Sequence, residues 1–268
     1  MERIGGLCDR YRQAVLAAAC SGRLTADWGK DSESTWQSTI LGELIIDKPK
    51  NGYSAKPVNY ETAFRVLTLT ATTSGKFNSE CFKYFDQAID TDSPFWLQPG
   101  DILVQRGNTI EYVGVSAIYD GSPNQFIFPD LMMRLRVRPE VINQFLHILL
   151  SCGEARSYLR SKATGTAGTM PKINQPTLIS LPIDLPPLEE QKEIVQRVEK
   201  LFNTIAKIEQ QSQKALKLCD RLDQSILTKA FSGKLVPQDP TDEPAEVLLD
   251  RIRGEKQDPP KAKRKKTS

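Results

Sequence analysis

"PLEEQKEIVQRVEKLFNTIAKIEQQSQKALKLCDRLDQSILTKAF" spans residues 187–231 and predicts one long helix. Its side chains recur at alternating spacings of four and three residues, the heptad pattern of a coiled-coil seam. The seam consists of Ile194, Val198, Leu201, Ile205, Ile208, Ser212, Ala215, Cys219, Leu222, Ile226 and Lys229. Most of these residues are apolar or small. Val195, Phe202, Leu216 and Leu227 widen the apolar stripe. We therefore expect this helix to pack against more than one other helix.

The end of this helix repeats a stretch near the start of the chain. "LCDRYRQAVLAAACSGRL" at 7–24 and "LCDRLDQSILTKAFSGKL" at 218–235 share ten identical residues in eighteen positions, without a gap. Gly22 and Gly233 stand where each helix is predicted to end, because glycine terminates helices readily. Residues 4–20 are therefore predicted to form a short helix that duplicates the end of the long one.

The region between the two helices is rich in β-strand residues. Four such runs, separated by Gly, Asn and Pro turns, occupy residues 65–75, 100–108, 111–121 and 125–137. A further helix is predicted over 139–163, with Pro139 in its first turn. The predicted fold class is therefore α+β, a β-rich globular domain with a long coiled-coil helix. We expect five segments: an N-terminal helix in 1–30, the β-rich domain in 31–180, the coiled-coil helix in 181–236, a short helix in 237–254 and a basic disordered tail in 255–268.

The composition excludes several classes of protein. The net charge of +3 creates no strong overall field, although the last eight residues, "KAKRKKTS", hold five cations. Five cysteines without a CxxC pair, together with a single histidine, do not have the spacing of a zinc site. Neither a membrane-spanning apolar run nor a signal peptide is present in the sequence. We expect a cytoplasmic protein with reduced thiols and with no metal, cofactor or membrane partner.

Motifs of the common catalytic sites are missing from the sequence. It has no GxxxxGK[ST] phosphate loop, no GxGxxG turn and no GxSxG nucleophile elbow. An Asn-Pro-Pro-aromatic tetrapeptide of the kind found in amino-methyltransferases is also missing. For a metal-dependent nuclease the candidates are Asp101 and the pair Glu190 and Lys192. No catalytic residue is therefore predicted.

Three stretches resemble a known family. "LPIDLPPLEEQKEIVQRVEKLF" and "ILTKAFSGKLVPQDPTDEPAEVLLDRI" resemble the conserved spacer of specificity (S) subunits of type I restriction–modification systems, and "PGDILVQRGNTIEYVGVSAIYDG" is similar to the core of their target recognition domains. The resemblance covers roughly residues 36–254. It implies a target recognition domain in 31–180 and a spacer helix in 181–236. The implied function is DNA sequence recognition, while separate methyltransferase (M) and restriction/translocase (R) subunits methylate adenine and translocate or cleave DNA.

The sequence departs from that family in one respect. Full S subunits carry two recognition domains and two spacer helices, whereas one of each is found here, so the chain resembles a circularly permuted half-subunit. The repeat at 7–24 would then be the end of a spacer helix placed ahead of the recognition domain. We expect a homodimer that binds a bipartite, rotationally symmetric site in double-stranded DNA. The predicted dimer interface is the apolar seam, namely Ile194, Val198, Leu201, Ile205, Ile208, Leu222 and Ile226.

Three polar stretches have the donors, acceptors and cations that DNA recognition requires. The predicted DNA-binding residues are Lys48, Lys50, Asn51, Tyr53, Ser54 and Lys56 in 47–57, Gln105, Arg106 and Asn108 in 105–112, and Lys162, Thr164, Thr166, Thr169 and Lys172 in 161–172. Asn51-Gly52 and Gly107-Asn108 are equally ordinary turn dipeptides. Which residues contact bases and which contact phosphates stays open.

Two other functions remain open at this point. A free-standing metal-dependent nuclease with a helical dimerisation arm would cleave DNA in the presence of magnesium. A coiled-coil scaffold without a role on DNA would fail to bind DNA even when methyltransferase subunits are added.

Overall fold

The computed structural model describes residues 2–28, 36–165, 170–237, 239, 241 and 243–257. The chain divides into two units, Met1–Glu209 and Gln210–Ser268. Its helices are α1 (Glu2–Cys20), α2 (Asn143–Ser151), α3 (Gly153–Ser161), α4 (Gln175–Ile179), α5 (Leu188–Phe231) and α6 (Ala245–Gln257). Short 3₁₀ turns are η1 (Arg23–Thr25), η2 (Leu41–Leu44) and η3 (Leu69–Ala71). No helix in the described part of the chain is long and apolar enough to cross a membrane.

The two predicted copies of the repeated helix are both helical. α1 ends at Cys20 and α5 ends at Phe231. Gly22 and Gly233 follow these ends with φ values of 71° and 67°, a left-handed conformation that glycine adopts without steric cost. The glycine signal read from the sequence is therefore confirmed at both positions.

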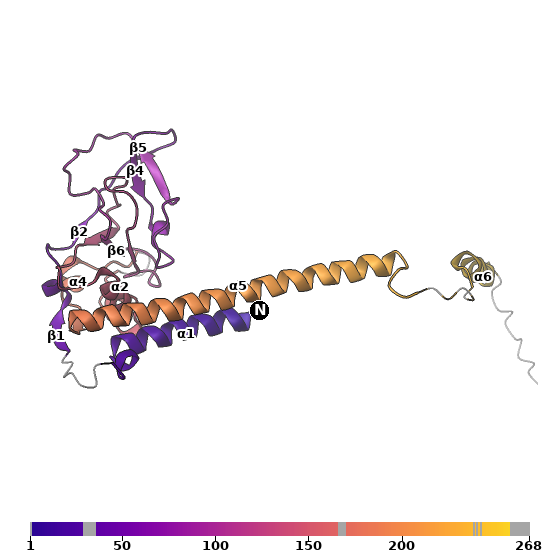
Figure 1. Ribbon diagram of the computed structural model, residues 1–268. Coiled ribbons are helices and arrows are strands. Elements are labelled where there is room, and N and C mark those ends of the chain that lie inside the picture. The colour runs from indigo at the N-terminus through magenta and orange to yellow at the C-terminus, as the bar shows by residue number, and fades with distance from the viewer. Residues whose placement is uncertain are drawn as a thin grey trace, which may run out of the picture. The chain divides into compact units, whose positions relative to one another are not determined.

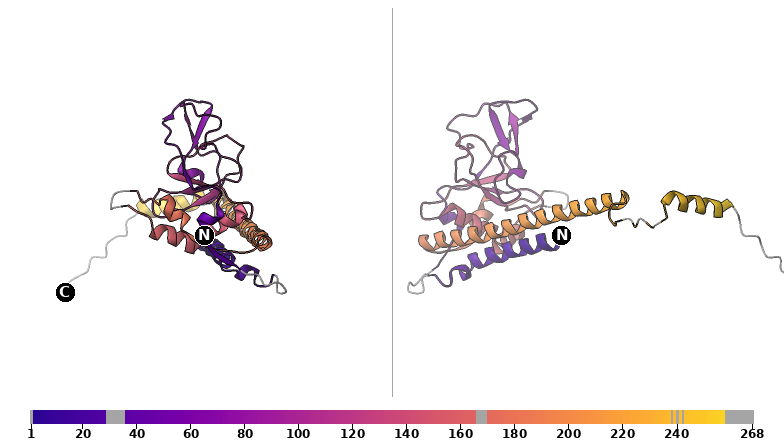
Figure 2. Two further views of the ribbon diagram at one scale, coloured as in Figure 1. Left: turned by 90° about the vertical axis from the view of Figure 1, so that its left-hand side faces the viewer. Right: turned by 45° about the vertical axis from the view of Figure 1, so that its right-hand side comes forward.

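Within the first unit, α1 lies antiparallel to the first half of α5, and Figures 1 and 2 show the two helices side by side. In the middle of α1, Arg12 Nη2 lies 2.6 Å from Glu209 Oε2. Beyond the end of α1, Thr25 Oγ1 donates a 2.8 Å hydrogen bond to the buried Glu190. One contact in the middle of α1 and one beyond its end thus fix its register along α5.

Three small antiparallel sheets make up the β-structure of the described residues. In the four-stranded sheet the strand order is β2 (Lys50–Asn51), β8 (Met132–Leu135), β6 (Ile102–Gln105) and β7 (Ser116–Ile118). In the three-stranded sheet the order is β3 (Pro57–Val58), β5 (Phe82–Phe85) and β4 (Phe64–Leu67), and β1 (Gln37–Ile40) pairs with β9 (Pro182–Leu185). Together with the helices, these sheets confirm the predicted α+β class.

The main hydrophobic core joins the helices to the four-stranded sheet. It contains Val15 and Ala19 from α1, Phe145 from α2 and Ile102 from β6, all of them buried. Residues of the first half of α5 complete the same core: Ile194, Val195 and Val198. Apolar burial of this kind is the main stabilising contribution to a domain.

This core corrects part of the predicted dimer interface. Ile194, Val198 and Ile205 have exposed fractions of 0%, 2% and 1%, because the chain's own core already covers them. Leu201 is half-buried beside the same core. A heptad seam does not reveal which of its turns are covered within one chain, so the sequence alone could not separate these residues from an interface.

The second unit contains the end of α5 and α6, and most of its described large apolar side chains are exposed. Leu222 is 60% exposed, Ile226 42% and Phe231 91%. On the first unit, Ile208 of α5 is also exposed, at 48%.

The helix predicted over 139–163 is wrong as a single element. Cys152 has φ −70° and ψ 155°, an extended conformation that separates α2 from α3, and Pro139 precedes α2 rather than lying in its first turn. The apolar spacing continues across this break, so the sequence pattern does not show it. The sequence also did not predict the pairing of β1 with β9, whose strands lie more than a hundred residues apart along the chain.

Candidate nucleic-acid interface

The predicted DNA-binding stretches meet at one end of the four-stranded sheet. Gln105, the last residue of β6, pairs with Met132, the first residue of β8. Asn51, the last residue of β2, pairs with Met133 of the same strand. Because these pairings are antiparallel, the ends of β2 and β6 and the start of β8 lie at the same end of the sheet.

A turn over 128–132 lies between the first two stretches. Tyr53 N–H donates a 2.8 Å hydrogen bond to the carbonyl oxygen of Phe128, and Arg106 N–H donates one of 2.8 Å to that of Leu131. Gly52 passes so close to this turn that a Cβ atom there would overlap the carbonyl oxygens of Phe128 and Pro129. The glycine of the Asn51-Gly52 dipeptide is therefore required by this close approach of two backbone segments.

The third stretch is joined to the second by backbone hydrogen bonds. Thr164 and Lys172 each donate their N–H to the other's carbonyl oxygen, at 2.8 and 2.9 Å. Ile173 N–H donates to the carbonyl oxygen of Arg106 at 2.8 Å, and Gly107 bridges to Lys172. We name the assembled segments 47–57, 105–112, 128–132, 156–164 and 170–173 the loop end of the sheet.

The predicted side chains differ in how available they are for a ligand. Those that are exposed are Lys48, Lys50, Ser54, Lys56, Lys162, Thr164 and Lys172, and those that are half-buried are Asn51, Tyr53, Arg106 and Asn108. Thr166 and Thr169 lie outside the described residues.

Gln105 is a correction to the predicted set, because its side chain is completely buried. Its amide Nε2 donates to the carbonyl oxygen of Leu69 at 2.9 Å and to Thr72 Oγ1 at 3.0 Å, while its Oε1 accepts a 2.7 Å hydrogen bond from Asn108 Nδ2. Asn108 Oδ1 in turn accepts from Thr109 N–H at 2.7 Å. Gln105 and Asn108 therefore hold the turn in place rather than reach outward to a base.

Arg106 has unused hydrogen-bonding capacity at the loop end. Its Nη1 donates a long hydrogen bond of 3.4 Å to the carbonyl oxygen of Asp130. Its Nε is buried and has no partner among the described residues. A buried donor without an acceptor is costly, but the buried Nε cannot reach an outside ligand, so the terminal nitrogens of this half-buried guanidinium are the ones that could donate to an anionic or carbonyl ligand.

Two arginines that the sequence reasoning missed also reach the loop end. Arg156 Nη2 and Arg160 Nη2, one turn apart on α3, both donate to the carbonyl oxygen of Glu111, at 2.6 and 2.8 Å. Neither forms an ion pair with a described residue. Burial, and secondarily the charge of Arg160, lowers the pKa of Arg156 to about 10. The signal in the sequence was two arginines at i and i+4, which place both side chains on one helix face.

The loop end carries an excess of positive charge. Its segments contain eight Lys or Arg residues and three Asp or Glu residues. The cationic residues are Lys48, Lys50, Lys56, Arg106, Arg156, Arg160, Lys162 and Lys172, and the acidic ones are Asp47, Glu111 and Asp130. This balance favours an anionic partner, even though the chain as a whole is close to neutral.

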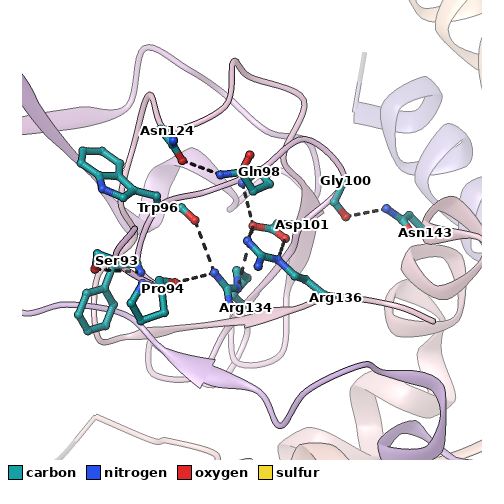
Figure 3. A network of polar contacts seen from close by, with 11 residues as sticks. Ser93, Pro94, Trp96, Gln98, Gly100, Asp101, Asn124, Arg134, Arg136 and Asn143 are labelled. Carbon is teal, nitrogen blue, oxygen red and sulfur yellow. Dashed lines mark hydrogen bonds and ion pairs between the residues drawn. The ribbon is translucent and has the colours of Figure 1, made fainter. Parts of the chain in front are cut away.

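Figure 3 shows the network that secures the start of β6. Asp101 is 2% exposed and accepts hydrogen bonds from Arg136 Nε at 2.7 Å and from Gln98 N–H at 2.9 Å. Arg134 Nη1 donates to the carbonyl oxygen of Pro94 at 2.5 Å. Burial lowers the pKa of Arg134, although the nearby Asp101 carboxylate opposes this shift.

These contacts bear on the nuclease hypothesis. The carboxylate of Asp101 is engaged by Arg136, and that of Glu190 accepts hydrogen bonds from Thr25 and from Trp36 Nε1. Both candidates for a metal site are thus committed to holding the fold. Among the described residues, no group of three or more His, Cys, Asp or Glu side chains could hold a metal ion.

Comparison with known proteins gives a consistent picture. Residues 33–218 match the family described as "Type I restriction modification DNA specificity domain". The chain is 31% identical over 266 residues to the specificity subunit of the type I restriction enzyme EcoKI from Escherichia coli K12, covering 95% of this chain and 57% of that protein. It is 35% identical over 268 residues to the StySPI specificity subunit from Salmonella potsdam, covering 96% of this chain and 57% of that protein.

Solved structures show the same fold. A chain of a solved type I R-M system matches with a TM-score of 0.57 and 21% identity, over 88% of this chain and 57% of that chain. The HsdS subunit from Thermoanaerobacter tengcongensis matches with a TM-score of 0.50 and 21% identity, over 87% of this chain and 57% of that chain. The chain therefore spans a little over half the length of these relatives.

Proposed function

The chain belongs to the family of type I restriction–modification DNA specificity domains, and from this premise we propose that it recognises a DNA sequence and is not itself a catalyst. The observation that carries the proposal is the loop end of the sheet. It gathers segments far apart in sequence into one surface, with eight cationic and three acidic residues. Cations on a rigid sheet end position a duplex through its phosphates, and polar side chains between them read base edges.

The contacts at the loop end suggest a division of roles. Lys162 and Lys172 are exposed and flexible, which suits phosphate contacts. Arg106 is half-buried, and its Nη1 donates to the carbonyl oxygen of Asp130, so the freedom of its guanidinium is restricted. A guanidinium held in this way suits a bidentate contact with guanine, which is the commonest specific contact in the major groove.

This division is tested with Arg106→Ala and Lys172→Ala, using DNA selected from a random duplex pool by the purified protein. Lys172→Ala should weaken binding to all duplexes and lower the slope of log K against log salt by about one. Arg106→Ala should cost about 1–3 kcal/mol and relax selection at one base pair. Lys200→Ala, an exposed lysine on α5, is the matched control. Wild-type affinity and selectivity in both variants would place the recognition surface elsewhere.

We further propose that two copies of the chain associate through helices, as the repeat suggests. The residues through which α1 docks are Cys8, Val15, Leu16 and Ala19, each at most 7% exposed. The repeat places Cys219, Ile226, Leu227 and Ala230 at the equivalent positions, and all four are exposed. The second segment thus keeps the residues of a docking helix without a surface that covers them.

The first unit offers a surface on which such a helix could dock. Ile4, Leu7 and Tyr11 of α1 are 43%, 59% and 49% exposed, and Ile208 of α5 is 48% exposed. Spacings of three and four residues place the three α1 side chains along one face of the helix. An antiparallel second copy would cover these residues with its own segment 218–235. The proposed interface is therefore restricted to Ile208, Leu222, Ile226 and their neighbours.

In this proposal each part of the chain has a distinct role. Residues 31–180 read DNA, the helix within 181–236 sets the separation of two recognition domains, and the helix within 1–30 completes the bundle. The helix α6 spans Ala245–Gln257, so it begins inside the segment 237–254 expected to hold a short helix and extends into the segment 255–268 expected to be a tail, of which residues 258–268 lie outside the described residues. Methyltransferase subunits, and restriction/translocase subunits where the system has them, would bind to the dimer in the cytoplasm.

Association with these subunits is tested by reconstitution. Methyltransferase subunits of the same system, mixed with the purified chain, should methylate a rotationally symmetric, two-part site in plasmid DNA. Sequencing of the methylated positions provides the readout. An asymmetric site would contradict the homodimer and leave DNA recognition intact, whereas the absence of both DNA binding and methylation would contradict the proposed function as a whole.

A further inference from the structure

Two cysteines from distant parts of the first unit meet beside the end of α1. Cys20 is the last residue of α1, and Cys152 lies between α2 and α3. Both line one pocket, together with Leu149, Glu154 and Asp184. Cys152 is 5% exposed and Cys20 is half-buried. No disulfide joins them in this structure, where both are free thiols.

The surroundings of Cys152 favour a thiolate. Cys152 immediately precedes the first turn of α3 and shares a pocket with Cys20, so the backbone N–H groups of Glu154 and Ala155 and the Cys20 thiol stabilise its negative charge. These donors lower the pKa of Cys152 to about 7, although burial opposes the shift. The pKa of Cys20 is raised, because its proton is held between the two sulfurs and the site is buried. The pair thus combines a nucleophilic thiolate with an adjacent thiol.

The repeat does not carry the thiol at position 20 into its second copy. Cys8 recurs as Cys219, Leu16 as Leu227 and Ala19 as Ala230, but position 20 carries Phe231 in the second copy. The thiol at position 20 belongs to this junction alone, where it meets Cys152.

We propose that Cys20 and Cys152 form a redox-sensitive pair that peroxides oxidise to a disulfide. The Cys152 thiolate attacks one oxygen of hydrogen peroxide, so an S–O bond forms, the O–O bond breaks and hydroxide leaves. The Cys20 sulfur then attacks the sulfenic acid, so the S–S bond forms and the S–O bond breaks. Two thiols lose two electrons and two protons in total, and one peroxide is reduced to two molecules of water.

The disulfide would fasten the end of α1 to the α2–α3 junction. It would close a long loop between the two cysteines, which restricts the unfolded chain and stabilises the folded first unit. Oxidation would therefore fix α1 in its position along α5, without involving any residue of the loop end of the sheet.

The test uses the reduced, full-length protein and a small excess of hydrogen peroxide, followed by alkylation and peptide mass spectrometry. We expect a peptide pair linked through Cys20 and Cys152, the loss of two of the five free thiols, and full reversal by dithiothreitol. Cys20→Ser should leave a sulfenic acid on Cys152 that dimedone traps. Cys152→Ser should leave Cys20 unoxidised, and Cys219→Ser should behave as the wild type.

Several outcomes would overturn the proposal. These are the absence of the linked peptide pair, its formation only in denaturant, or equal thiol loss in Cys20→Ser, Cys152→Ser and the wild type. Should Cys152→Ser fail to fold, dimedone labelling of the folded wild-type protein during brief oxidation decides the matter, because it must mark Cys152 before any other cysteine.

Discussion

α1 and the segment 218–235 have nearly the same sequence and opposite surroundings. Leu16 is 5% exposed and Ala19 is completely buried, whereas their equivalents Leu227 and Ala230 are exposed. Both copies are helical and both end at a glycine with positive φ. Sequence therefore determines the helix and its apolar face, while burial depends on whether a matching surface is present.

The largest effect is expected from charging the exposed copy. The double variant Leu222→Glu, Ile226→Glu should convert the proposed dimer to monomers, because an apolar helix pair cannot cover facing carboxylates. The wild type should show about twice the chain mass by light scattering at low micromolar concentration, and the variant should show the chain mass. Gln210→Glu with Gln213→Glu adds the same charge at exposed polar positions and should leave the mass unchanged. A monomeric wild type would remove the basis for the dimer.

A matched pair of truncations compares the two copies directly. Leu16→Ala should lower the free energy of unfolding by about 2–5 kcal/mol, because it opens a cavity in the main core. Leu227→Ala, the same change in the copy, should leave the unfolding of a dilute, monomeric sample almost unchanged and should instead weaken self-association. Urea titration and sedimentation separate the two effects. Equal losses of unfolding free energy would mean that 218–235 is already covered within the monomer.

A smaller effect, on DNA affinity, is expected from removing cations of α3 but not from removing a cation of the segment 218–235. Arg156→Ala and Arg160→Ala should each weaken binding to any duplex and lower the salt slope by about one, because both guanidiniums lack an ion-pair partner among the described residues. The matched change in the repeated segment, Lys229→Ala, should leave the slope in place. Fluorescence anisotropy over a range of salt concentrations gives both quantities. An unchanged slope in the arginine variants would exclude α3 from the DNA surface.

The comparison of the two copies also shows which features of the fold and of the DNA-binding surface can be predicted from the sequence. Both copies of the helix were predicted, because a long heptad pattern and a gapless repeat are strong local signals. The loop end was predicted as three separate stretches, but their convergence depends on strand register, which the sequence does not display. Gln105 was assigned to DNA because a polar residue at a strand end looks the same whether it points inward or outward. Arg156 and Arg160 are not distinguished in the sequence, because two arginines four residues apart on a helix are equally typical of a face that only meets solvent.

The smallest expected effect is a dependence of the free energy of unfolding on pH that arises from a residue of the first unit. His147 is the single histidine of the chain, and burial lowers its pKa from 6.5, although a hydrogen bond with the Gly75 backbone opposes the shift. Because the unfolded chain binds the proton more readily, stability from this group is full above about pH 6.5 and falls as pH decreases below it. The slope cannot exceed about 1.4 kcal/mol per pH unit for one proton.

Urea titrations at pH 7.5, 6.5 and 5.5 measure this dependence. His147→Gln should lose the part of the slope that lies below pH 6.5. Ser116→Ala removes the hydroxyl that lies 3.0 Å from His147 Nδ1 and should keep the slope, because burial rather than this hydrogen bond lowers the pKa. Leu227→Ala should keep it as well, because the exposed copy of α1 contains no histidine. A wild-type slope in His147→Gln would assign the pH dependence to carboxylates and would show that the imidazole is not buried in its neutral form.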